Sequence, residues 1–150
     1  MTLIAHKADD GREQPLDKHL QNVSRLAAEY AAPIGGQALA RRAGLAHDIG
    51  KCTDGFQRYI RDPEHNIKCP HSIIGAAACA KAGDLVSALV AEGHHTGLHD
   101  MWDTKNNIDA ALIKRAGDVR KAELLYPVQN CTIDDIPLHM RTLKNMGLYS

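Results

Sequence analysis

The sequence predicts an all-α protein that forms one domain. Apolar residues make up 44% of the 150 residues but aromatic residues only 4%, and Ala and Leu dominate, which favours helices over a β-sandwich. Apolar positions recur at three- and four-residue steps, whereas no stretch alternates long enough to predict a strand. A chain of this length suits one compact unit, so we expect residues 1–150 to form a single domain.

Proline and glycine mark the boundaries of the expected helices in the N-terminal half. Pro15 suits the first position of a helix, Pro33 follows its last turn, and Gly50 stops the next helix. A third helix begins at a cap, Thr53 or Asp54, and ends before a proline. The helices expected in this half cover residues 15–32, residues 37–48 and a short segment between Thr53 and Pro63.

The C-terminal half contains one segment of small apolar residues, 72–81, which we expect to be buried in tight helix packing. Asp84 caps the helix after it, and residues 93–107 are expected to be irregular because glycines interrupt them. The helices expected in this half cover residues 72–81, 84–92, 108–125 and 133–146.

Charge and cysteine usage exclude several classes of protein. Lys and Arg number 18, as do Asp and Glu, and zero net charge argues against a protein that coats nucleic acid or membranes by bulk electrostatics. No secretion signal and no apolar run of about 20 residues is present, so we expect a cytoplasmic protein with no membrane partner. The four cysteines lack CxxC spacing, although a zinc site that uses Cys52 or Cys69 is kept as an alternative hypothesis.

Histidine is the unusual residue, with nine in 150, and several of the nine lie at expected helix ends. His47-Asp48 closes one helix, His71 opens another, and His94-His95 ends a third, where side chains from separate helices can converge. Five imidazoles and one carboxylate suit one or two divalent ions, with Asp48 between them. Mn, Fe, Co or Ni suits these ligands better than Mg, and Zn is also compatible. The candidate ligands are His19, His47, Asp48, His71, His94 and His95.

Each of these residues also has a simpler interpretation. His19 alone on an amphipathic helix is more often a surface or core residue, and Lys51 alone is a solvated turn residue. The sequence predicts no functional role for four further histidines: His6, His65, His99 and His139.

Four segments resemble the HD nuclease domain of the CRISPR-associated type I helicase–nuclease. They read AHKADD…QPLDKHLQNVSRLAAEYA, AGLAHDIGKCTDGFQRYIRD, HSIIGAA and AEGHHTGLHD, and they follow one another in the family's order between His6 and Asp100. The HDxGK part also occurs across the wider HD phosphohydrolase superfamily, whereas the later segments point to this branch. By motif, the six candidate ligands match the family's metal ligands, and Lys51 matches its lysine.

The resemblance implies a metal-dependent nuclease that cleaves single-stranded DNA in the foreign-DNA R-loop. It also implies a helicase domain or subunit as partner, and through it the CRISPR RNA-guided surveillance complex. The sequence departs from the family in one respect, because it lacks a late metal-binding Asp in a segment resembling SxLVDAD. Asp100, Asp103 and Asp109 are too close in sequence to His95 to replace it.

The chemistry expected of these residues is hydrolysis of a phosphodiester by a metal-activated water, with Asp48 and Lys51 as catalytic groups. Lys51, Arg58 and Arg61 are the candidates for DNA contact. The rival hypotheses are an HD-type phosphohydrolase that acts on nucleotides or another small phosphoester, and a metal-free module without activity. No Gly-rich phosphate loop is present that would indicate an ATPase.

Overall fold

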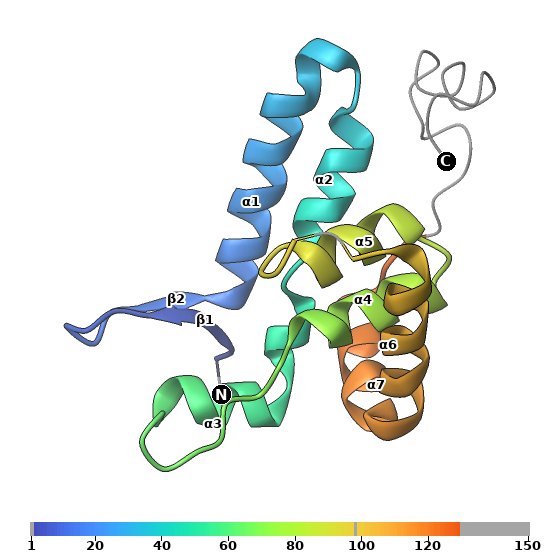
Figure 1. Cartoon of the computed structure of the whole chain (residues 1–150). Coiled ribbons are helices and arrows are strands. Elements are labelled where there is room, and N and C mark those ends of the chain that lie inside the picture. The colour runs from blue at the N-terminus through green and yellow to red at the C-terminus, as the bar shows by residue number, and fades with distance from the viewer. Residues whose placement is uncertain (1, 98, 130–150) are drawn as a thin grey trace.

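Seven α-helices form most of the computed structural model, which describes residues 2–97 and 99–129 (Figure 1). Two 3₁₀ helices, η1 (Ala32–Ile34) and η2 (Ile49–Cys52), connect helices in the N-terminal half. None of the described helices combines the length and apolar character that crossing a bilayer requires. The α-helices are α1 (Leu16–Ala31), α2 (Gln37–Ala46), α3 (Asp54–Arg61), α4 (Ser72–Lys81), α5 (Leu85–Gly93), α6 (Met101–Lys114) and α7 (Ala116–Leu125).

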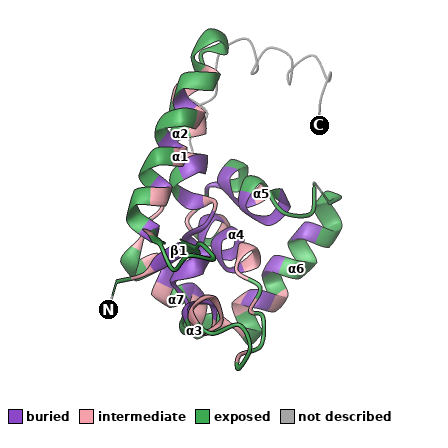
Figure 2. Cartoon of the chain, turned by 90° about the vertical axis from the view of Figure 1, so that its left-hand side faces the viewer, coloured by how far each residue is buried: buried purple, intermediate pink, exposed green. Residues whose placement is uncertain are grey.

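Helix α4 is the centre of the core, as its small apolar residues predicted. Ile74 and residues 76–79 have no exposed surface, and Figure 2 shows this helix buried among its neighbours. Helices α5, α6 and α7 and the 3₁₀ helix η2 all pack against it. Alanine and glycine let these helices approach closely, so the core is formed by backbone proximity more than by bulky side chains.

Helices α1 and α2 form an antiparallel pair that extends away from this core (Figure 1). Gly44 lies where the two helices meet, and a Cβ atom there would lie 2.6 Å from the Cα of Ser24. The Ser24 hydroxyl donates to the carbonyl of Arg41 at 2.8 Å, which fixes the two helices in register. This pairing holds the end of α2, and the turn after it, against the first turns of α1.

A short β-hairpin at the N-terminus corrects the expectation that no strand would form. Strand β1 (Ile4–Lys7) pairs antiparallel with β2 (Glu13–Pro15). Contacts distant in sequence stabilise the pair: Gln57 donates from Nε2 to the Ile4 carbonyl at 2.9 Å and accepts from the Ile4 amide at 3.1 Å. Strands this short carry too little alternation to be recognised from sequence.

Most helix boundaries agree with the sequence prediction to within two residues. Pro15 belongs to β2 and precedes α1, and α2 ends at Ala46, so that His47-Asp48 lies beyond the helix. Two expected caps are confirmed: Thr53 Oγ1 accepts from the Phe56 amide, and Asp84 Oδ1 accepts from the Ser87 amide.

The prediction for residues 93–125 is wrong in two respects. Helix α6 begins at Met101, inside the segment expected to be irregular, because the Asp100 carboxylate caps it by accepting from the Asp103 amide at 2.9 Å. The helix expected over 108–125 breaks at Arg115, whose guanidinium donates to the Pro70 carbonyl and pairs with Asp118. The helix expected over 133–146 lies outside the described residues.

We expect Gly44→Ala to destabilise the protein by about 2 kcal/mol, because its methyl group would overlap the α1 backbone and force the two helices apart. Urea unfolding followed by far-UV circular dichroism measures this loss. Gly117→Ala on α7 is the matched control, since no atom lies within 4 Å of the new Cβ. An equal loss of stability in both variants would contradict the close packing of α1 against α2.

Candidate metal centre

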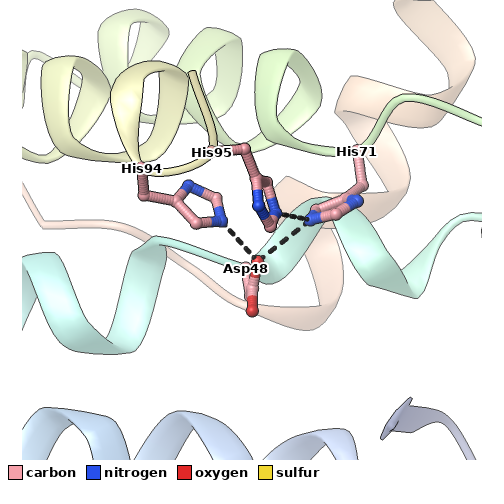
Figure 3. A group of neighbouring side chains, drawn as sticks. All are labelled: Asp48, His71, His94 and His95. Carbon is pink, nitrogen blue, oxygen red and sulfur yellow. Dashed lines mark hydrogen bonds and ion pairs between the residues drawn. The ribbon is translucent and has the colours of Figure 1, made fainter. Parts of the chain in front are cut away.

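The carboxylate of Asp48 lies at the centre of a group of imidazoles (Figure 3). Its Oδ2 lies 2.8 Å from His19 Nε2 and 3.1 Å from His47 Nε2. Its Oδ1 lies 3.1 Å from His71 Nε2 and 3.0 Å from His94 Nε2. Each carboxylate oxygen therefore faces two imidazole nitrogens, and Asp48 itself is only 3% exposed.

The ligands come from element ends that the fold brings to one place. His19 lies on the first turns of α1, His71 directly precedes α4, and His94 and His95 follow α5. Gly50 permits the closest approach, because a Cβ atom there would lie 1.9 Å from the His71 carbonyl oxygen. The convergence expected from the positions of the histidines in the sequence is thus present in the structure.

Two overlapping ligand groups share the Asp48 side chain. One comprises His71, His94 and His95 with Asp48, and the other comprises His19 and His47 with Asp48. Within each group, one candidate ligand atom from every residue lies within 4.8 Å of the others. The six residues proposed from sequence as ligands are therefore brought together.

The orientation of two imidazoles is fixed by backbone carbonyls. His47 Nδ1 lies 2.7 Å from the Gly44 carbonyl oxygen, and His94 Nδ1 lies 2.7 Å from the Ala91 carbonyl oxygen. A carbonyl can only accept, so each Nδ1 carries the proton, and Nε2 is directed at Asp48. This is the arrangement of metal-binding histidines, whose second nitrogen donates to a carbonyl and orients the ring.

The electrostatics of the group fit a divalent cation. Burial raises the pKa of Asp48, but hydrogen bonds from His19, His47, His71 and His94 outweigh it and hold that pKa far below its ordinary value. Without a cation, each of these bonds needs a proton on Nε2, and His47 and His94, whose Nδ1 already carries a proton, would both be positively charged beside one carboxylate. Neutral imidazoles that direct lone pairs at one cation, together with the carboxylate, avoid this repulsion, and nitrogen and carboxylate ligands suit first-row divalent metals.

One further contact favours the same interpretation. Nε2 of His95 lies 3.0 Å from Nε2 of His71, so two imidazole nitrogens face each other (Figure 3). Two lone pairs at this distance need a shared proton or a cation between them. Burial, followed by the nearby His94 and His71, lowers the pKa of His95, which disfavours its charged form and leaves a nitrogen lone pair for a cation.

Lys51 is not the solvated turn residue of the simpler interpretation. It is 4% exposed, and its Nζ lies 3.2 Å from Asp48 Oδ2 and donates to the Ala5 carbonyl at 3.2 Å. The same nitrogen lies 5.5 Å from the centre of the Phe56 ring, which in turn packs edge-on against His71. Lys51 therefore connects the carboxylate to strand β1.

The two arginines suggested for DNA contact do not join this group. Arg61 donates to the Gln57 side chain at 2.6 Å and also to the Thr2 carbonyl, so it supports the N-terminal strand. Arg58 is exposed on α3, two residues beyond Phe56, and helical geometry turns it away from the face that contacts His71. Their role in DNA contact stays a prediction.

Two histidines that sequence reasoning left without a role lie next to the site. The His6 ring on β1 packs edge-on against His19, with 4.8 Å between ring centres, and the hairpin that places it has no clear sequence signal. His99 Nδ1 lies 2.5 Å from the buried Glu92 carboxylate, which Thr104 also contacts. The seven-residue spacing of Glu92 and His99 spans a loop, so no periodicity could reveal this pair.

The aspartates that follow His95 lie elsewhere, as their sequence spacing suggested. Asp100 caps α6 with Asp103 in its first turn, and Asp109 pairs with Lys105. No cysteine joins a group of metal-binding residues in the described part of the chain, where Cys52 and Cys79 are buried.

A family model of the HD domain matches residues 16–122, which include all six candidate ligands. The chain belongs to the HD domain family. This assignment agrees with the superfamily part of the sequence resemblance and with the mostly helical fold around a His/Asp cluster.

Curated relatives also match this HD domain. Ribonuclease Y of Clostridium botulinum is 34% identical over 106 residues, which is 70% of this chain and 18% of the relative. Ribonuclease Y of Desulforudis audaxviator and that of Clostridium tetani are each 33% identical over the same length. The chain spans about a fifth of the length of these relatives, so the likeness concerns their HD region.

We expect Asp48→Ala to weaken metal binding by about 100-fold or more, because both ligand groups lose the carboxylate that they share. Residues that only orient a metal ligand already contribute roughly 10–100-fold to metal affinity, and a ligand itself should contribute at least as much. His47→Ala should weaken binding to a smaller extent. Titration calorimetry with Mn²⁺ measures both effects. His65→Ala, on an exposed loop residue, is the control. Near-normal metal affinity in Asp48→Ala would refute the site.

Proposed function

We propose that this protein is a metal-dependent phosphodiesterase that cleaves single-stranded DNA. The observation that carries the proposal is the pair of ligand groups that share Asp48. Such an arrangement can hold two ions side by side, and paired divalent ions are a recurrent means of hydrolysing phosphodiesters. Membership of the HD domain family supports the hydrolytic chemistry, and the sequence resemblance supports the nuclease assignment.

The residues have separate parts in this chemistry. His71, His94 and His95 would hold one ion and His19 and His47 the other, with Asp48 contributing to both. When bound, divalent ions supply an activated water and neutralise charge on the phosphate. Lys51 lies against Asp48 Oδ2, where its charge orients the carboxylate and offsets negative charge at the site.

The preference for a single strand follows from how the site is built. The side chains of His19, His71 and His94 lie at converging helix ends and are only 13%, 13% and 18% exposed, so a phosphate must reach in between these helix ends to meet them. A duplex is stiff, whereas a single strand can adapt its backbone to fit there. Zero net charge also gives the chain little general affinity for DNA. The proposal therefore includes a helicase domain or subunit that delivers the strand, and through it a CRISPR RNA-guided surveillance complex.

Two other classes of substrate are compared with single-stranded DNA in the experiment described below. The relatives are named ribonucleases, which makes single-stranded RNA a candidate. A small phosphoester such as a nucleotide is another, because the metal-binding motif alone does not distinguish substrates.

After chelation, we expect activity to return with Mn, Co or Ni more readily than with Mg or Ca, because imidazole ligands favour late first-row ions over oxygen-seeking ones. Initial rates on bis(4-nitrophenyl) phosphate across the metal series test this order. Equal rates with Ca would count heavily against the proposed ligand set.

We also expect cleavage of single-stranded DNA, flaps and R-loops at least about tenfold faster than cleavage of blunt duplex. Gel assays that compare one labelled sequence as single-stranded DNA, duplex DNA and single-stranded RNA, together with free nucleotides, test this preference. Faster cleavage of RNA than of DNA would show that the proposed substrate is single-stranded RNA instead. Equal cleavage of duplex, or far faster hydrolysis of nucleotides, would overturn it.

A further inference from the structure

A hollow of about 380 Å³ lies directly beside the candidate metal centre. The residues on both sides of His71, Pro70 and Ser72, line it, and so does Thr96, which follows His95. His71 and His95 do not themselves line the hollow, but their neighbours in the chain do, so the hollow adjoins the ligand group to which both histidines belong. A molecule whose phosphate reached that ligand group would extend into this space.

The floor of the hollow is apolar, and its far wall is one face of α6. Ile73 of α4 and Ala110 and Ala111 of α6 form the floor. Asn107 and Lys114 also line it, and since they are seven residues apart they lie on one face of α6, about 10 Å from each other. The hollow is thus lined by apolar residues and by two polar side chains spaced along α6.

The end near Asn107 presents a buried carboxylate. The Glu92 side chain is only 5% exposed and lines the hollow together with His99. Its Oε1 has one short contact, with His99 Nδ1 at 2.5 Å, and a weak one with Asn107 Nδ2 at 3.5 Å, while Oε2 has only a weak contact with Thr104 Oγ1 at 3.4 Å. A carboxylate accepts about four hydrogen bonds, so Glu92 retains capacity to accept more.

The end near Lys114 presents positive charge. Lys114 is exposed, and Arg115 beside it donates to the Pro70 carbonyl at 2.5 Å, next to His71. An apolar floor between an acceptor end and a cationic end matches a nucleoside, whose flat base carries donor groups and whose sugar bears phosphates.

We propose that this hollow is a nucleoside subsite for the nucleotide that adjoins the phosphate held at the metal centre. The base packs on the apolar floor, its exocyclic amino group donates to Glu92, and Lys114 meets the next phosphate of the strand. The inference deepens the proposed nuclease function and rests on it. It assigns substrate contacts to Glu92 and Lys114 that the metal site does not need, and Asn107, whose Nδ2 lies 3.5 Å from Glu92 Oε1, positions the Glu92 carboxylate beside the base.

The test compares a substrate that has nucleosides with one that has none. We expect Asn107→Ala and Lys114→Ala each to raise the KM of a short single-stranded oligonucleotide about tenfold, the effect of one lost hydrogen bond or ion contact. The KM of bis(4-nitrophenyl) phosphate should change less than twofold, because that diester has neither an amino group to donate to Glu92 nor a second phosphate to meet Lys114. The matched controls are Asn106→Ala and Lys105→Ala, exposed residues of the same helix outside the hollow.

Binding measured without turnover gives an independent readout. Fluorescence anisotropy of a labelled oligonucleotide with the chelated protein should show the same weakening in Asn107→Ala and Lys114→Ala, and oligo-dA should bind more tightly than oligo-dT, which has no amino group. Unchanged anisotropy and unchanged oligonucleotide KM would overturn the subsite while the proposed function stands. Wild-type protein that hydrolyses neither substrate with any metal would refute the proposed function, and anisotropy would then decide the subsite alone.

Discussion

A buried carboxylate surrounded by imidazoles is the constraint on which the rest of this structure depends. Asp48 is nearly inaccessible to solvent and has His19 and His47 at one oxygen, and His71 and His94 at the other. Burial of such a charge is unfavourable unless every lone pair finds a partner. Its partners come from four separate helix ends, so α1, α2, α4 and α5 must all end or begin near this point.

The packing of the core meets this requirement with small residues. Glycine at position 50 lets the His71 backbone approach η2, and glycine at position 44 lets α1 lie directly against α2. Lys51 and Gln57 then hold strand β1 to the same region, since Lys51 contacts both Asp48 and the Ala5 carbonyl. The hairpin is therefore an extension of the site's hydrogen-bond network as much as a separate element of secondary structure.

Sequence reasoning succeeds here where a signal is local. The caps Thr53 and Asp84 and the buried run at 72–81 were predictable because short-range hydrogen bonds and apolar composition decide them. The histidines that meet at Asp48 were predictable because they lie at helix ends. The hairpin and the break at Arg115 were not predictable, since contacts with residues as distant in sequence as Gln57 and Pro70 accompany them. The start of α6 is an exception, because its signal, the Asp100 cap, is local and was overlooked beside the glycines of the segment.

Local and long-range signals also differ in what they reveal about the site. The metal-binding residues have a local signal, whereas the residues of the proposed subsite do not. His47 and Asp48 stand next to each other in the sequence, so a motif can reveal them, and the motif is shared by hydrolases with different substrates. Glu92 of α5 meets Asn107 and Lys114 of α6 only because both helices pack against α4. If the proposed subsite is correct, substrate choice depends on side chains that the metal ligands do not fix, because the ligand groups constrain the helix ends and leave the face of α6 that lines the hollow without a role in metal binding.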